Sequence, residues 1–430
     1  MISKRFLHTV AHEHSLSPSE QEALVLAMTD KPTAAIAKDL GISGDAIRKR
    51  LSEVYQKFKI SGRGPVKRTK LQQQLIARYQ QEQGSAGDLG ADPSAPLHAD
   101  SASASAISTL RHYWGEAPDS AVFFNREAEL AQLEQWVNAQ SRLVALLGMA
   151  GVGKTALAVR LARQLQGEVD AVIWLSLRPA PPLYALVDQL GQTLPEGSQS
   201  GSEPASQLLQ LLHRHRCLLI LDGVEAILQS GRLAGTYRSG YEAYGDLLQR
   251  VAQEPHQSTV LLTSQEKPLA VARLEGERSA VRSLTLTGLD AANATLLLRE
   301  KGLTGDAHPW QDLIRGYRGN PFMLQMVATT IREVFDGDVK TFLKTTLFTH
   351  DISDYIETIL ERVSTMEADI LQQIAQQQPV AMADLIEAVP EASPQALIAA
   401  LQSLKQRSLL ESSEGRFSLP PAVLEVVADA

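Results

Sequence analysis

The residues with the clearest chemistry form a glycine-rich loop that runs from Gly148 to Thr155. Glycines permit a backbone in which successive N–H groups turn inward and make a nest for anions. In a loop of the form Gly-x-x-x-x-Gly-Lys-Thr, the lysine lies against the β- and γ-phosphates and the threonine hydroxyl binds Mg²⁺. We therefore predict that ATP or ADP is bound by Gly148, Gly151, Val152, Gly153, Lys154, Thr155 and Ala156.

The residues on both sides of this loop are those that such a loop requires. Residues 143–147 (LVALL) form a short apolar run, which is typical of a buried parallel strand. Residues 156–165 (ALAVRLARQL) have helical periodicity, and the positive end of that helix adds to the attraction for phosphate. A simple glycine-rich turn with an exposed lysine is the alternative, and the flanking strand and helix argue against it.

A second magnesium contact is expected from the end of a neighbouring strand. Residues 218–221 (LLIL) are apolar and are followed by Asp222, which places a carboxylate where the chain leaves the sheet. We predict that Thr155 and Asp222 hold Mg²⁺ and that Asp222 is a catalytic carboxylate.

Length and composition limit the class of protein. A chain of 430 residues is too long for one ordinary core, so we expect several domains. No apolar stretch approaches the roughly 18 residues of a membrane span, and the first residues contain no secretory signal. The chain has one cysteine, Cys217, which excludes an intrachain disulfide and fits a reducing compartment. We expect a cytoplasmic protein without a membrane partner.

The charge is distributed unevenly along the chain. The whole protein has a net charge of -8, whereas residues 38–70 contain ten basic and three acidic residues, a net charge of +7. Residues 84–106 are rich in Ala, Ser, Gly, Asp and Pro, which predicts a flexible linker after this basic segment. Beyond the linker, alternating apolar runs and helical patterns predict a parallel α/β domain, and helical periodicity dominates from about residue 284.

From about residue 117 to the end, the order of motifs resembles the NB-ARC nucleotide-binding module of STAND signal-transduction ATPases, in its bacterial, cyanobacterial-type form. Residues 123–127 (FFNRE) resemble the motif that leads into this module, and residues 319–321 (GNP) resemble the turn of its helical subdomain. The resemblance implies that Arg126 and Pro321 lie near the adenine. It also implies a helical subdomain followed by a structural winged helix.

Three positions depart from the family pattern. Gly223 follows Asp222 where a second acid is usual, and Glu225 is the nearest replacement and therefore the second candidate catalytic carboxylate. Gln265 stands where an arginine usually reads the γ-phosphate, and a neutral amide cannot offset developing phosphoryl charge as a guanidinium does. Pro420 stands where a histidine usually contacts bound ADP. We expect nucleotide binding with slow hydrolysis at best.

The basic N-terminal segment has the signals of a helix-turn-helix. A capping box at residues 17–20 (SPSE) starts one helix, residues 33–40 form a second that ends at Gly41, and Ser43 caps a third that runs to about Phe58. The segment resembles the LuxR/NarL class of DNA-binding domain. We predict that duplex DNA is contacted by Ser43, Arg48, Lys49, Ser52, Lys57 and Arg63.

These observations predict five parts: a helix-turn-helix domain (1–83), a linker (84–106), a nucleotide-binding α/β domain (107–283), a helical subdomain (284–350) and a winged helix (351–430). We interpret the chain as a transcription regulator switched by ATP and ADP, with self-association and a separate sensor protein as expected partners. The alternative is an ATP-dependent oligomeric scaffold in signalling or defence, whose N-terminal helices bind a protein instead of DNA.

Overall fold

The computed structural model describes residues 10, 16, 17, 19, 21, 44–58, 112–119, 126–193, 203–305 and 307–429. The chain divides into two compact units, residues 1–104 and 105–430, and each is described by itself. Within the described residues, no helix combines the length and the apolar character needed to cross a membrane.

The first unit contains α4 (Gly44–Lys57), which is the helix predicted after Ser43. Leu51, Val54 and Phe58 are buried at helical spacing, while Lys49 and Ser52 are exposed and Lys57 is partly exposed. The helix itself is confirmed, but the helix-turn-helix is not, because the turn and second helix at residues 33–43 lie outside the described residues. Ser43, Arg63 and the side chain of Arg48 also lie outside them.

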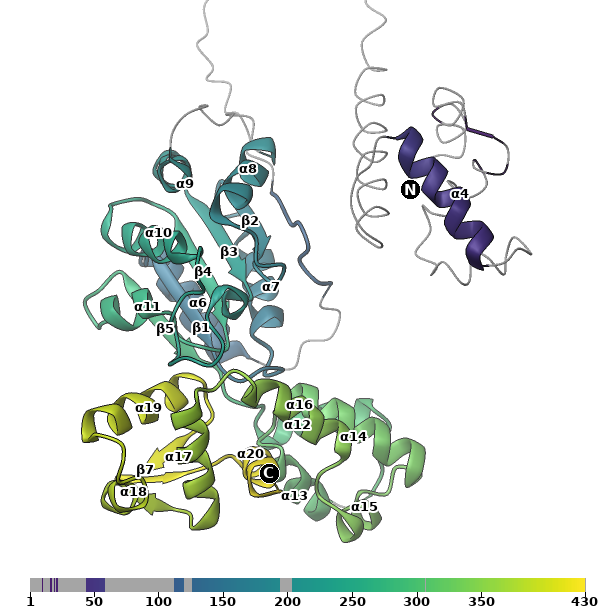
Figure 1. Cartoon of the computed structure of the whole chain (residues 1–430), viewed down its shortest axis with the longest axis vertical. Helices are drawn as coiled ribbons and strands as arrows, with labels where there is room; N and C mark the ends of the chain where they lie inside the picture. Colours follow the sequence, from purple (N-terminus) through teal and green to yellow (C-terminus); the bar gives the residue numbers. More distant parts are fainter. Residues whose placement is uncertain are drawn as a thin grey trace, which may run out of the picture. The chain divides into compact units, whose positions relative to one another are not determined.

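The second unit is built on a parallel sheet of five strands, as the alternating pattern predicted (Figure 1). The strand order is β2-β3-β4-β1-β5. The strands are β1 (Leu143–Leu147), β2 (Ala171–Ser176), β3 (Cys217–Asp222), β4 (Thr259–Ser264) and β5 (Val281–Thr285). Because all five are parallel, the segments that follow β1, β2, β3 and β4 leave the sheet at one edge.

Helices cover both faces of this sheet, so β1, β2, β3 and β4 are almost entirely buried, whereas β5 at the edge is more exposed. One face packs against α6 (Glu127–Asn138) and α7 (Lys154–Leu165). The opposite face packs against α8 (Leu183–Thr193), α9 (Pro204–Arg214), α10 (Glu242–Gln253) and α11 (Leu269–Leu274). In β1, Val144 and Leu146 face the first group, whereas Leu143, Ala145 and Leu147 face the second.

The remaining residues form a mainly helical region, drawn in green and yellow in Figure 1. Its first helices are α12 (Ala291–Glu300), α13 (Ala307–Gly316), α14 (Pro321–Val334), α15 (Val339–Thr345) and α16 (His350–Leu360). They are followed by α17 (Thr365–Gln376), α18 (Met382–Ala388), α19 (Pro394–Gln406) and α20 (Pro421–Asp429). The last segment adds an antiparallel sheet in the order β6 (Val380–Ala381), β8 (Arg416–Ser418) and β7 (Glu411–Ser413).

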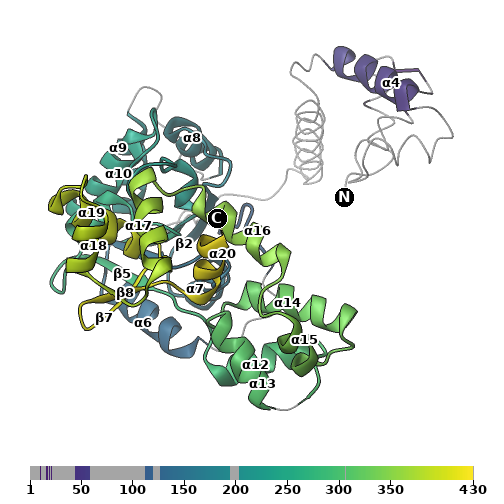
Figure 2. The same cartoon turned by 60° about the horizontal axis from the view of Figure 1, so that its bottom comes forward.

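One hydrophobic cluster runs through this whole region, from Leu289 to Val427. Figure 2 shows the last helix, α20, beside α16, and the two helices are in contact. The predicted helical subdomain and winged helix therefore share a core. At the other boundary, β5 continues to Thr285, beyond the predicted end of the α/β domain at residue 283.

Candidate nucleotide-binding site

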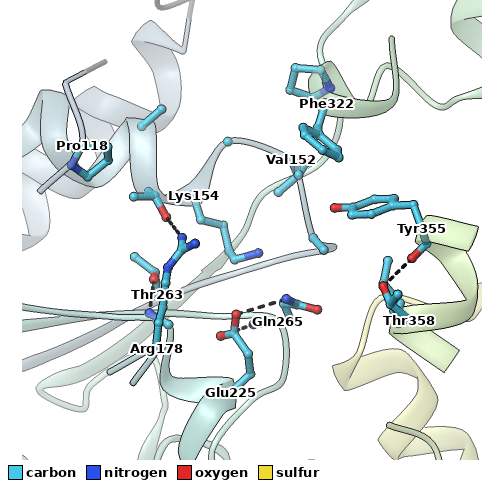
Figure 3. Close-up of a pocket in the computed structure, with 18 of the residues that line it drawn as sticks. Pro118, Val152, Lys154, Arg178, Glu225, Thr263, Gln265, Phe322, Tyr355 and Thr358 are labelled. Atoms are coloured by element: carbon cyan, nitrogen blue, oxygen red, sulfur yellow. Dashed lines mark hydrogen bonds between the residues drawn. The ribbon is translucent and has the colours of Figure 1, made fainter. Parts of the chain in front are cut away.

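A cavity of about 800 Å³ opens where the strands of the parallel sheet end. This volume falls within the range of roughly 300–1,000 Å³ that is usual for small-molecule sites. The loop after β1 lines one wall, and Arg178, Glu225 and Gln265 follow the ends of β2, β3 and β4. The opposite wall comes from the helical region, with Phe322 of α14 and Tyr355 of α16 (Figure 3).

The structure brings the sequence-predicted nucleotide residues together around this cavity. Its lining includes Arg126, Gly151, Val152, Gly153, Lys154, Thr155, Ala156, Glu225 and Pro321. Gly148 does not line the cavity but contributes its carbonyl oxygen to Lys154, and Asp222 is buried directly beneath Thr155.

The glycines of the loop have the backbone angles for which they were singled out. Gly148, Gly151 and Gly153 have φ values of 140°, 76° and 104°. A Cβ on Gly151 would lie 2.6 Å from Cβ of Phe322, so close packing of the loop against α14 also requires glycine there. Gly153 caps α7, whose first residue is Lys154.

Carbonyl oxygens of the loop itself position the ammonium group of Lys154. Its Nζ donates hydrogen bonds to the carbonyl oxygens of Gly148 at 2.8 Å and Met149 at 3.0 Å, and the residue is only 8% exposed. Burial lowers the pKa of Lys154 from 10.5 to about 8, although the nearby carboxylates of Glu225 and Asp222 oppose that shift. A phosphate beside this ammonium would favour its charged form.

This pKa predicts that nucleotide affinity falls as the pH rises above 8. Below pH 8 the free protein already carries the charged ammonium, and above it a proton must be taken up before the phosphate gains its partner. The association constant should therefore fall by about tenfold for each pH unit above 8. Calorimetry from pH 7 to pH 9.5 measures this, with circular dichroism at pH 9.5 to control for unfolding. Equal affinity across that range would contradict the prediction.

Asp222 is the centre of a polar cluster beneath the loop. One carboxylate oxygen accepts hydrogen bonds from the hydroxyls of Thr155 and Thr263, both at 2.7 Å. The other oxygen accepts from Nε of Arg178 at 3.2 Å. A carboxylate and a hydroxyl in contact are the hard oxygen ligands that Mg²⁺ prefers, so Thr155 and Asp222 fit the predicted metal.

Glu225, the candidate for the second catalytic carboxylate, and Gln265, which stands where an arginine is usual, are bonded to each other. One carboxylate oxygen of Glu225 accepts from the Gln265 side-chain amide at 3.1 Å, and the other accepts from the Gln265 backbone N–H at 3.3 Å. Figure 3 shows this pair at the cavity wall opposite Phe322. Gln265 is therefore engaged with a carboxylate and brings no positive charge to the cavity.

The guanidinium of Arg126 stabilises the phosphate loop through hydrogen bonds. It donates to the carbonyl oxygen of Thr287 at 2.7 Å and to that of Val152 at 3.3 Å, and it pairs with Glu129 at 2.9 Å. The side chain thus ties the phosphate loop to the segment after β5 while also lining the cavity.

The loop is also bonded directly to the helical region. Nδ2 of Asn320 donates to the carbonyl oxygen of Ala150 at 2.9 Å, and the backbone N–H of Phe322 donates to that of Gly151 at 3.3 Å. The side chain of Asn320 also caps the N-terminus of α14, where its oxygen accepts hydrogen bonds from the backbone N–H groups of Phe322 and Met323. The ring of Tyr355 packs 4.9 Å from the ring of Phe322, and its hydroxyl points towards the loop (Figure 3).

A charge cluster lies next to Gln265 and consists of the buried residues Glu266, Glu367 and Arg407 and the partly exposed Arg362; we call it the Glu266 cluster. One oxygen of Glu266 accepts from Arg362 and from Arg407, each at 2.6 Å. Arg407 also donates to Glu367 at 3.2 Å. Arg362 lines the nucleotide cavity, so the cluster connects the end of β4, the cavity and the helices α17 and α19.

Several of these residues were missed by sequence reasoning. Arg178 could have been found by the rule that led to Asp222, because it also follows the carboxyl end of a strand. Phe322 and Tyr355 come from α14 and α16, and Arg362 from the turn after α16; the packing of this region onto the loop has no signal in the local sequence.

Comparisons with known proteins place the central domain. Residues 142–302 match the family model of the NACHT domain. These residues therefore match a NACHT P-loop NTPase domain, whereas the motifs resemble the NB-ARC module. The chain is 40% identical over 337 residues to an uncharacterized WD repeat-containing protein of Nostoc sp., a match that covers 74% of this chain and 27% of that protein. The chain thus spans about a quarter of the length of this curated relative.

One of the similar solved structures supports the fold. The Walker-type ATPase of Pyrococcus abyssi matches with a TM-score of 0.51 at 18% identity, over 71% of this chain and 96% of that one. A STAND protein with a tetratricopeptide repeat sensor from Pyrococcus horikoshii matches with a TM-score of 0.40 at 18% identity, over 73% of this chain and 43% of that one. These matches give no support to the predicted LuxR/NarL-type domain.

Proposed function

We propose that this chain is a nucleotide-dependent signalling switch, in which ATP or ADP bound with Mg²⁺ at the NACHT domain sets the position of the C-terminal helices. One observation carries the proposal: the phosphate loop and helices α14 and α16 line the same cavity. A nucleotide there would contact both regions, so any difference between ATP and ADP would act on their packing.

The bonds around the loop indicate how the nucleotide would act on the helices. The backbone of Ala150 and Gly151 is bonded to Asn320 and Phe322, and a phosphate in the loop must draw Lys154 away from the carbonyl oxygens that now hold it. Beside the loop, the Glu266 cluster joins the end of β4 to α17 and α19. A shift of Gln265 or Arg362 would therefore change the packing of α17 and α19.

We further infer that residues 351–430 form a winged-helix unit. The support is the order of α17, α18 and α19 before the β7–β8 hairpin, whose strand β8 also pairs with β6. The predicted boundaries at residues 284 and 351 remain part of this proposal, as do the roles of the individual site residues.

Hydrogen exchange tests whether the nucleotide acts on the helices. Adding ATP or ADP to the full chain should slow amide exchange in α7, because the nucleotide covers the loop. It should also change exchange in α14 and α16, and the two nucleotides should differ there. Protection confined to residues 148–165 would mean that the protein binds nucleotide without switching.

For the output of the switch, we favour self-association and protein partners over the DNA reading. The family match covers the NTPase domain, and the relative from Nostoc sp. is named for WD repeats, a class of repeats in proteins. We infer that a repeat-containing sensor acts with this domain and that ATP promotes assembly. Light scattering on the hydrogen-exchange samples tests the assembly, which should appear with ATP and not with ADP.

A further inference from the structure

Arg178 is bonded to both residues that fit Mg²⁺. Its Nε donates to Asp222 at 3.2 Å, and its terminal nitrogen lies 3.3 Å from the hydroxyl oxygen of Thr155. Asp222 is a buried carboxylate, and Arg178 is the cation paired with it. In the structure, a guanidinium therefore supplies the positive charge that a metal ion would supply in the nucleotide complex.

The unusual Gly223 makes room for this arginine. A Cβ at residue 223 would lie 2.8 Å from Cγ of Arg178, and Gly223 has a φ of 82°, which side-chain-bearing residues rarely adopt. The missing second acid after Asp222 is thus linked to the arginine that occupies its space. Gly223 therefore leaves space for the Arg178 side chain, in addition to removing the second carboxylate that is usual at this position.

The backbone next to Arg178 is fixed by the sheet, whereas the Arg178 side chain is exposed. The backbone N–H of the preceding Leu177 donates to the Asp222 carbonyl oxygen at 2.8 Å, which holds the end of β2 beside β3. The Arg178 side chain is 67% exposed and lines the nucleotide cavity on the same side as Lys154 (Figure 3). The guanidinium can therefore turn from Asp222 towards the cavity without a change in the sheet.

We propose that Arg178 holds the metal position in the nucleotide-free protein and pairs with the γ-phosphate when ATP and Mg²⁺ are bound. This inference rests on the proposed nucleotide binding and names the residue that distinguishes ATP from ADP. Gln265, at the position where an arginine was expected, is neutral and bonded to Glu225, so Arg178 takes over that charge.

Electrostatics makes the two positions of Arg178 exclusive. If Thr155 and Asp222 held a divalent cation, its charge would repel a guanidinium bonded to the same two residues, so Arg178 would turn away from them. Thr155 and Asp222 would hold the ion beside the terminal phosphates of ATP, and Arg178, which is bonded to both residues and lines the cavity, would then lie within reach of the γ-phosphate. ADP lacks that group, so the displaced guanidinium finds no phosphate partner and the ADP complex is weaker.

Calorimetry on the full chain tests the proposal with Mg–ATP and Mg–ADP and with the variants Arg178→Gln and Arg178→Lys. Wild type should prefer ATP, and Arg178→Gln should reduce the ratio of ATP to ADP affinity by about tenfold to a hundredfold, the effect of one hydrogen bond between charged groups. Arg178→Gln should also lower the Mg²⁺ concentration needed for half-maximal ADP binding, because the competing guanidinium is gone. Arg178→Lys keeps the charge and should retain part of the preference.

The exposed Arg160 of α7 provides a matched control, and Arg160→Gln should leave both quantities unchanged. An Arg178→Gln variant with the wild-type affinity ratio and Mg²⁺ dependence overturns the proposal, as does an equal loss of affinity for both nucleotides. If wild type binds neither nucleotide, the proposed function fails together with this inference.

Discussion

Replacing Lys154 with alanine is expected to lower the affinity for both ATP and ADP by at least about a hundredfold, the equivalent of two charge-assisted hydrogen bonds. The buried ammonium is the only cation inside the loop itself, between residues 148 and 155. Without it, a phosphate in the loop loses the positive charge that would offset its own. The core loses little volume, so the fold should be kept.

Calorimetry with each nucleotide measures this loss. Arg160→Ala removes a positive charge from the same helix at an exposed site, so it controls for the general effect of charge. Circular dichroism should give the same spectrum for both variants as for wild type. Nucleotide affinity in Lys154→Ala within a few-fold of wild type would contradict the assignment of the phosphate loop.

The phosphate loop could be predicted in detail because its determinants are local. The apolar run ends at Leu147 as predicted, the helix begins at Lys154, and Asp222 is the last residue of β3. Each of these positions depends on neighbours within a few residues, namely apolar strand residues, glycines with positive φ and the polar residue at the strand end. The parallel α/β fold follows from the same alternation of short apolar runs and helices.

The far wall of the site could not be predicted in this way. Tyr355 and Arg362 come from α16 and the turn after it, some two hundred residues beyond the loop, and their approach depends on how the helical region packs. The significance of Gly223 and Gln265 also changed with the structure. Both appear in the sequence as losses from a family pattern, but Gly223 accommodates Arg178 and Gln265 bonds to Glu225.

The Glu266 cluster gives the second large expected effect. Arg407 is 4% exposed and donates to Glu266, Glu367 and the carbonyl oxygen of Arg232. Arg407→Ala would leave Glu367, which is fully buried, without its cation and would leave Glu266 with Arg362 alone. Removing one partner from a buried ion pair usually costs about 3–5 kcal/mol.

We therefore expect Arg407→Ala to lower the free energy of unfolding by about 3–5 kcal/mol. Urea denaturation followed by circular dichroism measures it. Lys405→Ala, which removes an exposed charge two residues before Arg407 at the end of α19, should cost less than about 1 kcal/mol. A loss in Arg407→Ala no larger than that in Lys405→Ala would mean that the cluster contributes no net stability. The expected loss of stability comes from the contact between Glu266, after the end of β4, and Arg407, after the end of α19. Because Glu266 directly follows Gln265, which lines the nucleotide cavity, this contact joins the last helices to the nucleotide site.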